Sequence, residues 1–294
     1  MKRSLALILF LTFLLSIGFS AGAIPAEETD YLIIHYIDVD QADGMLLIAG
    51  DTTVLIDAGN LETAGKMVDY LHRFGVEELD LVVNTHPHMD HMGGINTVMN
   101  AFPTKEVWCS HATYDSAAFQ YFVSAAQRQD LSIQHPEPGT VYAADGLTIK
   151  VLGPLQTVDK YNDLNDTSLV LMVEFGEKRF LFTGDMEAFA ENQLVQSSAD
   201  LKADVLKVGH HGSYSSTSQS FLNKVSPEYG IISCGRDNEY GHPHKEPMTQ
   251  LKNADVELYR TDLMGDIVLV TDGQTIAFFL STRNTEVTGY DKAA

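Results

Sequence analysis

Four side chains that can bind metal ions fall within six consecutive residues of this sequence. They form the pattern HxHxDH and are His86, His88, Asp90 and His91. Imidazole nitrogens and carboxylate oxygens suit zinc, manganese and iron. A loop that follows a strand can turn alternate residues toward one ion and the next pair toward a second. The spacing therefore predicts a metal site, and Gly93 and Gly94 indicate that a helix begins just after it.

Three later segments add candidate ligands. FLFTGD is an apolar strand that ends in Asp185. A carboxylate in that place can bind two ions at once and hold them about 3.5–4 Å apart, as two-metal hydrolysis requires. The segments LKVGHHGS and YGHPH contribute His210, His211, His242 and His244. Together with HxHxDH, the last two segments contain seven of the eleven histidines, which is not the scatter expected of surface histidines.

The first 23 residues have the pattern of a secretory signal peptide. Lys2 and Arg3 precede an apolar run from Leu5 to Phe19, and the sequence Ala-Gly-Ala ends at Ala23 as a cleavage site. We expect a secreted, extracytoplasmic protein that begins at Ile24 and has no transmembrane helix after cleavage. An uncleaved membrane anchor is the alternative, although the run is shorter than the ~20 apolar residues of a spanning helix.

We predict that residues 24–294 form one domain, with its core at about 32–280 and a loose C-terminal tail.

The composition of the chain limits its possible functions. The 294-residue chain is 45% hydrophobic and carries a formal net charge of −21. This charge disfavours a scaffold that binds nucleic acid by bulk charge, because phosphate contacts need Lys and Arg. A metal-dependent nuclease is compatible, since metal ions supply local positive charge. We expect Cys109 and Cys234 to be buried thiols, with a disulfide as the alternative.

Apolar patterning and turn residues predict the elements that position these groups. Predicted strands cover 31–39, 45–49, 53–56, 79–84, 106–109, 147–152, 168–175, 179–182, 204–208, 230–233, 256–259, 267–271 and 275–280. Predicted helices cover 62–74, 114–128, 187–196, 218–225 and 246–253. Strand meanders broken by single helices in both halves favour an α/β fold with two mixed sheets and outer helices.

Together these motifs resemble the metallo-β-lactamase superfamily, in which HxHxDH is followed by TGD and later histidines. Residues 38–43 (DVDQAD), 55–59 (LIDAG) and 165–171 (NDTSLVL), with LKVGHHGS and YGHPH, resemble a narrower branch. That branch holds the extracytoplasmic hydrolase domain of ComEC-type DNA-uptake proteins, and the phosphorylcholine esterase module of choline-binding proteins is similar. The resemblance implies a four-layer αββα sandwich with two divalent ions at one edge, zinc being favoured and manganese the alternative.

The resemblance also implies a ligand set for each ion. Many members use a lone histidine between HxHxDH and the bridging aspartate, but here that interval has only His111 and His135, neither at the expected strand end. By resemblance to the esterase module, His211 takes that place, with His210 as the alternative. The first ion is then bound by His86, His88, Asp185 and His211. The second is bound by Asp90, His91, Asp185 and His242, with His244 as the alternative to His242.

Other polar residues receive supporting roles. Catalysis is assigned to Asp90, as a metal ligand, and to His210, which could donate a proton to the leaving oxygen or hydrogen-bond a phosphate. Asp57 is expected to orient a ligating histidine, and a plain turn aspartate is the alternative. The residues that could bind substrate, or could simply cap turns, are Gln41, Asp43, Asn165, Ser168, Ser213 and His244.

The leading hypothesis is a secreted dinuclear metal-dependent phosphodiesterase that uses a metal-bridging hydroxide. Its substrate would be nucleic acid or a phosphorylated wall or lipid head group, small or polymeric. The sequence shows no dedicated nucleic-acid-binding region and does not indicate an oligomeric state. Two alternatives keep the fold: a β-lactam or lactone hydrolase, and a non-catalytic metal-binding surface protein.

Overall fold

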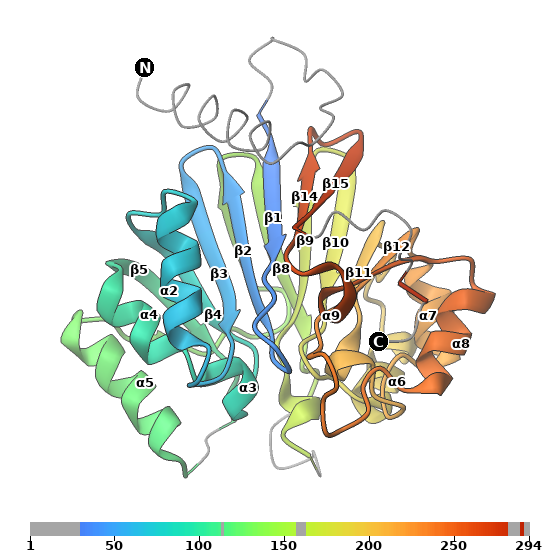
Figure 1. Cartoon of the computed structure of the whole chain (residues 1–294), viewed down its shortest axis with the longest axis horizontal. Coiled ribbons are helices and arrows are strands. Elements are labelled where there is room, and N and C mark those ends of the chain that lie inside the picture. Colours follow the sequence, from blue (N-terminus) through green and yellow to red (C-terminus); the bar gives the residue numbers. More distant parts are fainter. Residues whose placement is uncertain (1–29, 113–114, 157–162, 282–288, 291–294) are drawn as a thin grey trace.

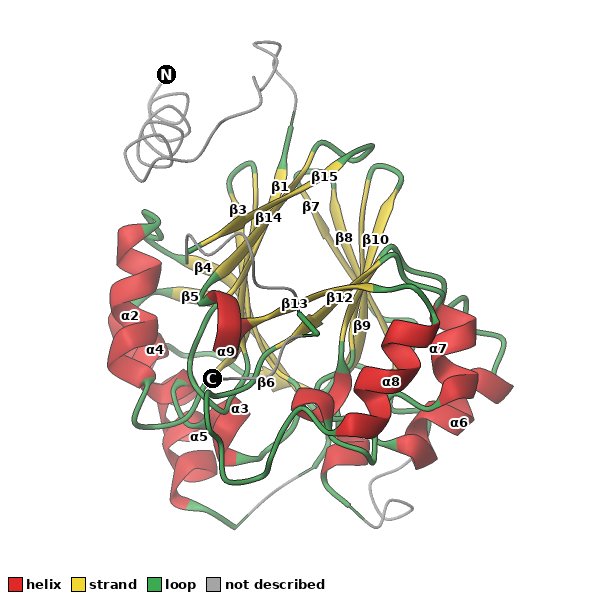
Figure 2. Cartoon of the chain, turned by 45° about the vertical axis from the view of Figure 1, so that its right-hand side comes forward, coloured by secondary structure: helices red, strands yellow, loops and turns green. Residues whose placement is uncertain are grey.

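A computed structural model describes residues 30–112, 115–156, 163–281 and 289–290. The strands of these residues form two mixed sheets that pack face to face, with helices on both outer faces (Figures 1 and 2). This arrangement confirms the predicted four-layer αββα sandwich. The predicted signal peptide, 1–23, and most of the predicted C-terminal tail lie outside the described residues.

The first sheet has eight strands in the order β15-β14-β1-β2-β3-β4-β5-β6. Their bounds are β1 (Leu32–Tyr36), β2 (Gly44–Ala49), β3 (Thr52–Ala58), β4 (Leu79–Asn84), β5 (Thr104–Cys109), β6 (Ile133–Gln134), β14 (Ile267–Thr271) and β15 (Ile276–Leu280). Pairing is antiparallel from β15 to β3 and parallel from β3 to β6. The parallel strands therefore end at one edge of the sheet, where the HxHxDH segment follows β4.

The second sheet has seven strands in the order β13-β12-β11-β10-β9-β8-β7. Their bounds are β7 (Val141–Ala144), β8 (Leu147–Gly153), β9 (Val170–Phe175), β10 (Lys178–Phe182), β11 (Val205–Lys207), β12 (Tyr229–Ile232) and β13 (Glu257–Arg260). Strands β10 to β13 are parallel, so the segments after β10 and β11 leave this sheet at the same edge.

Helices from each half of the chain cover the sheet of that half (Figure 2). The first half contributes α2 (Ala64–Arg73), α3 (Met89–Met92), α4 (Ile95–Ala101) and α5 (Ala117–Arg128). The second contributes α6 (Ala188–Gln196), α7 (Gln219–Val225) and α8 (Lys245–Asn253), with short 3-10 turns η2 (Asn165–Thr167) and η3 (Gly209–Gly212). The short helix α9 (Thr261–Met264) instead places Leu263 and Met264 in the central core.

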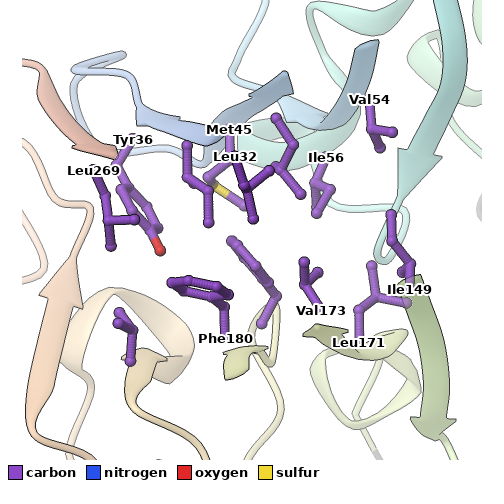
Figure 3. Close-up of a cluster of buried hydrophobic side chains, with 14 of the residues drawn as sticks. Leu32, Tyr36, Met45, Val54, Ile56, Ile149, Leu171, Val173, Phe180 and Leu269 are labelled. Atoms are coloured by element: carbon purple, nitrogen blue, oxygen red, sulfur yellow. The ribbon is translucent and has the colours of Figure 1, made fainter. Parts of the chain in front are cut away.

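The central core lies between the two sheets. Figure 3 shows Leu32 and Tyr36 of β1 facing side chains such as Phe180 of the opposite sheet. The intervening His35 points the other way, where its Nδ1 and the Tyr70 hydroxyl of α2 are hydrogen-bonded at 3.0 Å. Both faces of these strands are buried, so β1 reads as a continuous apolar run instead of an alternating one.

Most elements match the sequence prediction, and the differences have local causes. The first predicted strand ends at Tyr36, because residues 37–43 leave the sheet to approach the site. The helix predicted to begin just after Gly94 is α4, whereas the sequence missed α3, α9 and the short strands β6 and β7. Gly93 and Gly94 separate α3 from α4, and a Cβ on Gly94 would lie 2.1 Å from the Ala58 carbonyl oxygen. Glycine is thus required there by close packing, although it weakens the helical signal.

Three further observations bear on the sequence predictions. Cys109 and Cys234 are free and buried, as predicted, so they do not pair. In the tail, the Tyr290 hydroxyl donates to the Val256 carbonyl at 2.7 Å. Of the helices in the described residues, none has the length and apolarity needed to cross a membrane.

Candidate metal centre

The HxHxDH segment begins at the carboxyl end of β4 and continues into α3. Asp90 and His91 lie on this single helical turn, because the amides of His91 and Met92 both donate to the His88 carbonyl. His86 sits between two neighbours, with ring centroids 4.8 Å from His88 and 4.2 Å from His91. The strand end and the turn therefore bring all four predicted ligands of the motif into one cluster.

Asp185 follows β10 and reaches the same cluster from the second sheet. Its amide donates to the Ser168 hydroxyl at 3.1 Å, and its side chain is almost fully buried. One carboxylate oxygen lies 3.2 Å from Nε2 of His91, and the other lies 3.4 Å from Nε2 of His211. Asp185 thus lies between histidines from the two halves of the chain, as a bridging ligand would.

The pair His210–His211 follows β11 in a strained conformation. Both residues have left-handed backbone angles, with φ of 48° and 53°. His211 is buried, its Nδ1 donates to the Ser233 carbonyl at 2.9 Å, and its Nε2 lies 3.2 Å from Oδ2 of Asp90. Strain of this kind concentrates at functional sites, where the surrounding structure holds it in place.

Four of the predicted ligands converge closely. Asp90, His91, Asp185 and His211 each offer one ligand atom, and these atoms lie within 4.8 Å of one another. Nε2 of His91 and Oδ1 of Asp185 are buried and contact each other as an ion pair at 3.2 Å, with no further hydrogen-bond partner among the described residues. Buried polar atoms are costly unless they are well satisfied, and a cation bound by both atoms would satisfy them. The donor set therefore fits a divalent metal ion.

The charge balance of the cluster supports the same fit. Burial alone would lower the pKa of His91, but Asp185, Asp57 and Asp90 outweigh it and raise the pKa well above its usual value. Burial is outweighed in the same way at His211, chiefly by Asp185, so its pKa is also raised. The cluster therefore attracts positive charge, which divalent ions would supply in place of protons.

The family resemblance assigned His211 to the first ion and His242 to the second. The structure places these two side chains in different positions relative to the ligand cluster. His211 lies beside Asp90 and His91, which the sequence assigned to the second ion. His242 lies further out, with its ring centroid 6.2 Å from that of His211. Its Nδ1 accepts a hydrogen bond from Nε2 of Gln41 at 3.1 Å. The division of ligands between two ions stays a prediction.

Comparison with known proteins identifies the family. The sequence model of the metallo-beta-lactamase superfamily matches residues 37–236 of the chain. The chain belongs to the metallo-β-lactamase superfamily. This match spans most of the first sheet and the three strand ends that carry Asp185, His211 and the HxHxDH motif.

Curated relatives confirm the narrower, ComEC-like branch of the superfamily. ComE operon protein 3 of Bacillus subtilis is 29% identical over 252 residues, covering 80% of this chain and 32% of the relative. Competence protein ComA of Neisseria gonorrhoeae is 31% identical over 251 residues, covering 85% of this chain and 33% of the relative. The chain therefore spans about a third of the length of these relatives.

Solved structures agree on the fold. The metallo-beta-lactamase fold protein YhfI from Bacillus subtilis aligns with a TM-score of 0.56 at 14% identity, covering 82% of this chain and all of that one. CmlA, a diiron beta-hydroxylase from Streptomyces venezuelae, aligns with a TM-score of 0.55 at 14% identity, covering 84% of this chain and 55% of that one. At these identities the likeness shows the fold alone.

In this superfamily member, Asp57 supports the first half of the site. Its Oδ2 accepts from Nδ1 of His91 at 2.8 Å and from the Thr85 hydroxyl at 2.7 Å, and its Oδ1 accepts from the Thr85 amide at 2.8 Å. The aspartate is fully buried. These bonds fix the His91 ring and leave Nε2 facing the ligand cluster, which is how orienting carboxylates act in metal sites.

A buried ion pair that the sequence did not predict joins the two halves behind His211. Nζ of Lys207 lies 2.7 Å from Oδ2 of Asp43, and both side chains are fully buried. The other Asp43 oxygen lies 3.4 Å from Nδ1 of His211. Burial would raise the pKa of Asp43, but Lys207 and the neighbouring histidines outweigh it and lower the pKa to about 2. Asp43 therefore stays ionised under the site, where its side chain has no exposed surface.

The sequence also missed Glu187, which holds His210. Nδ1 of His210 donates to Oε1 of Glu187 at 3.0 Å, and the Ser215 hydroxyl donates to the same oxygen at 2.8 Å. Nε2 of His210 lies 3.8 Å from Asp185. Burial would lower the pKa of His210, but Glu187 and Asp185 outweigh it and raise the pKa. Glu187 gave no signal because an acidic residue at a helix start usually reads as a cap.

The remaining predicted polar residues form hydrogen bonds in the loops that carry the site residues. The Ser168 hydroxyl donates to the Asn165 carbonyl at 2.7 Å while it accepts from Asp185, so it braces the loop that carries the bridging carboxylate. Ser213 lies 2.9 Å from Ser215, hydroxyl to hydroxyl. His244 accepts the Tyr214 amide at its Nδ1, at 3.1 Å.

Proposed function

We propose that this protein is an extracytoplasmic dinuclear metal hydrolase that cleaves phosphodiester bonds. The observation that carries the proposal is the convergence of four buried or half-buried ligand atoms, in which Nε2 of His91 and Oδ1 of Asp185 lie 3.2 Å apart. His86 and His88 adjoin this group and offer ligands for a second ion. Two divalent ions, zinc or manganese, would supply a nucleophile from water and stabilise negative charge at phosphorus.

The chain's own residues would hold that chemistry in place. Asp185 would be the shared carboxylate that the family resemblance implies, and its two oxygens contact histidines from both halves of the chain. Asp57 and the Ser233 carbonyl fix the tautomers of His91 and His211, so that each presents Nε2 to the cluster.

His210 is the candidate proton donor or phosphate ligand. Glu187 and Ser215 engage its Nδ1 side, which leaves Nε2 directed toward the cluster. The ring is partly exposed, with 23% of the side chain accessible, so a substrate can reach it. Its proton would go to the leaving oxygen as the phosphodiester breaks. Asp90, with 32% of its side chain accessible, marks the open side of the site.

Two substrate classes fit this site: nucleic acid, and a phosphorylated wall polymer or lipid head group. The likeness to Competence protein ComA supports the first class. The net charge of −21 makes bulk electrostatic capture of a polyanion unfavourable, so either substrate would be held mainly at the site.

Hydrolysis of bis(p-nitrophenyl) phosphate by the metal-loaded protein tests the proposal. We expect turnover that a chelator abolishes and that the double substitution Asp90→Ala with His91→Ala removes. The matched control is Asp145→Asn, in the turn between β7 and β8, which should keep full activity. Turnover of a chromogenic lactam or a lactone without turnover of the phosphodiester would overturn the phosphodiesterase proposal and favour the alternative hydrolase.

Export is a separate part of the proposal. It is supported by the positive start, apolar run and small-residue site of the first 23 residues. N-terminal sequencing of the protein from expressing cells should find Ile24 as the first residue, in the extracytoplasmic fraction. A membrane-bound protein that retains Met1 would overturn cleavage and support the anchor.

A further inference from the structure

Four aromatic rings form a continuous series along the rim of the metal centre, which we call the aromatic ladder. Tyr214 contacts His244, with centroids 5.1 Å apart. His244 contacts His242 at 4.7 Å, and Tyr240 stacks on His242 at 5.6 Å with an interplanar angle of 22°. The two ends of the ladder are thus tyrosines, and its middle consists of the two histidines of the YGHPH segment.

The ladder begins at the site and ends in solvent. The His242 ring lies 5.5 Å from His210 and stacks on His211 at 6.2 Å, between centroids. Tyr214 and Tyr240, in contrast, are 70% and 61% exposed. Two large rings therefore face water on the rim of the site, where folding does not require them.

Hydrogen bonds hold the ladder in a fixed geometry. The Tyr214 amide donates to His244, and Nε2 of Gln41 donates to His242. Asn238 receives the His242 amide at 2.9 Å and donates to the His242 carbonyl. The two histidine rings and the Tyr214 backbone are therefore held in place before any ligand arrives, which lowers the entropic cost of binding to the ladder.

We propose that Tyr214 and Tyr240 are stacking platforms for the unpaired bases on either side of a scissile phosphodiester, so that single-stranded nucleic acid is the substrate class. The inference rests on the proposed phosphodiesterase function. A phosphodiester of nucleic acid joins the sugars of two nucleosides, each of which carries a base, and the ladder offers one exposed ring at each end. Paired bases are stacked inside the duplex and would not reach these rings.

The chemistry of stacking fits this acidic chain. A base that stacks on an aromatic side chain gains binding energy without any positive charge on the protein, and every base has a suitable face. The chain has 19 Lys and Arg against 40 Asp and Glu, so stacking compensates for weak phosphate attraction. A choline head group is less well matched, because a quaternary ammonium binds within an aromatic cage, and the two tyrosines are open.

The test compares two oligonucleotides that differ only in their bases. The probe is a fluorescein-labelled thymidine dodecamer with methylphosphonate linkages, which are uncharged and resist hydrolysis. The reference is an abasic dodecamer with the same linkages. By fluorescence anisotropy with the metal-loaded protein, we expect the thymidine probe to bind at least about fivefold more tightly, which corresponds to one stacked base.

Variants assign the effect to the ladder. Tyr214→Leu with Tyr240→Leu should remove the difference between the two oligonucleotides, whereas Tyr214→Phe with Tyr240→Phe should keep it. Tyr121→Leu is the matched control, because Tyr121 on α5 is 59% exposed and lies outside the ladder. Equal binding of both oligonucleotides, or unchanged binding by the leucine variant, would overturn the proposal.

Hydrolysis assays on the same preparations separate this proposal from the proposed function. Base-dependent binding without turnover of bis(p-nitrophenyl) phosphate would keep the stacking platforms and remove the phosphodiesterase. Turnover without base-dependent binding would keep the phosphodiesterase and overturn the stacking platforms. Turnover of p-nitrophenylphosphorylcholine with a KM raised by the leucine substitutions, and no thymidine binding, would overturn the nucleobase in favour of choline.

Discussion

The two halves of the molecule contribute to the metal centre in different ways. The first half supplies His86, Asp90 and His91 from one continuous loop and turn after β4. The second half supplies Asp185 and His211 from the ends of two separate strands, β10 and β11. The ligands of the first half are thus brought together by their spacing in the sequence. Those of the second half are brought together by the pairing of β10 with β11 in the sheet.

The supports of the two sides differ as well. In the first half a side chain, Asp57, orients His91. In the second half a backbone carbonyl, that of Ser233, orients His211, while the Lys207–Asp43 pair lies behind it. Substitution of the supporting side chain of the first side should therefore change metal affinity, and substitution of the Lys207–Asp43 pair should mainly change stability.

The largest effect is expected at Asp185, the carboxylate that both halves share. Asp185→Asn removes a negative charge and one of its two metal-binding oxygens, so we expect kcat for bis(p-nitrophenyl) phosphate to fall by about 10²–10³-fold or more. Steady-state kinetics with saturating zinc measures this. Asp145→Asn should leave kcat unchanged, and equal rates for both variants would show that Asp185 is not a shared ligand.

The ion pair that joins the halves should dominate stability. Lys207→Met leaves the buried Asp43 carboxylate without its partner, which is expected to lower the free energy of unfolding by about 3–5 kcal/mol. Guanidinium denaturation followed by the fluorescence of Trp108, the one tryptophan, measures it. Lys207→Met with Asp43→Asn should lose less than Lys207→Met alone; an additive loss would mean that the two charges are not coupled.

The same pair gives stability a defined pH dependence in acid. The pKa of Asp43 is lowered to about 2 in the folded protein. A lowered carboxyl pKa contributes stability above the unfolded value of about 3.9, and that contribution is lost as the pH falls toward 2. The double variant should lack this component of acid unfolding.

Glu191 predicts a pH effect of opposite sign that is confined to the second half. It accepts the amides of Thr217 and Ser218, after the His210–His211 turn, and burial raises its pKa to about 7 from its usual 4.5. A raised carboxyl pKa means that stability declines as the pH rises from about 4.5 to 7. Glu191→Gln should flatten that slope, by up to ~1.4 kcal/mol per pH unit. An unchanged slope would contradict the assignment.

The smallest effect compares the two orienting groups directly. Asp57→Asn should weaken zinc binding by about 10–100-fold, because the His91 ring loses its carboxylate partner. Ser233→Ala should not change zinc affinity, because His211 uses the backbone carbonyl. Competition with a chromogenic chelator measures both variants, and an equal loss in both would remove the proposed difference between the halves.

The sequence predicted what is local. Strands such as β4 and β10 and the contiguous HxHxDH ligands follow from apolar runs and spacing, and the sandwich followed from the family resemblance. The short strand β7 was missed because Val141 is 52% exposed and neighbouring residues are polar or small. α3 was missed because its single turn is followed at once by glycines.

The supports of the site could not be read from the sequence, because they join distant residues. Lys207 and Asp43 are 164 positions apart, and Lys207 resembles an ordinary charged residue in a short strand. Glu187 and His210 are 23 positions apart and belong to different segments. The ladder contact between Tyr214 and His244 likewise depends on two loops meeting.

Metal stoichiometry tests the central claim, that the two halves together hold two ions, most directly. The protein is purified without chelators and analysed by native mass spectrometry, with metal content determined on the same sample. We predict two divalent ions per chain, falling to one or fewer when Asp185 is replaced by Asn. A wild-type protein that retains one ion or none in the presence of excess zinc would contradict the account.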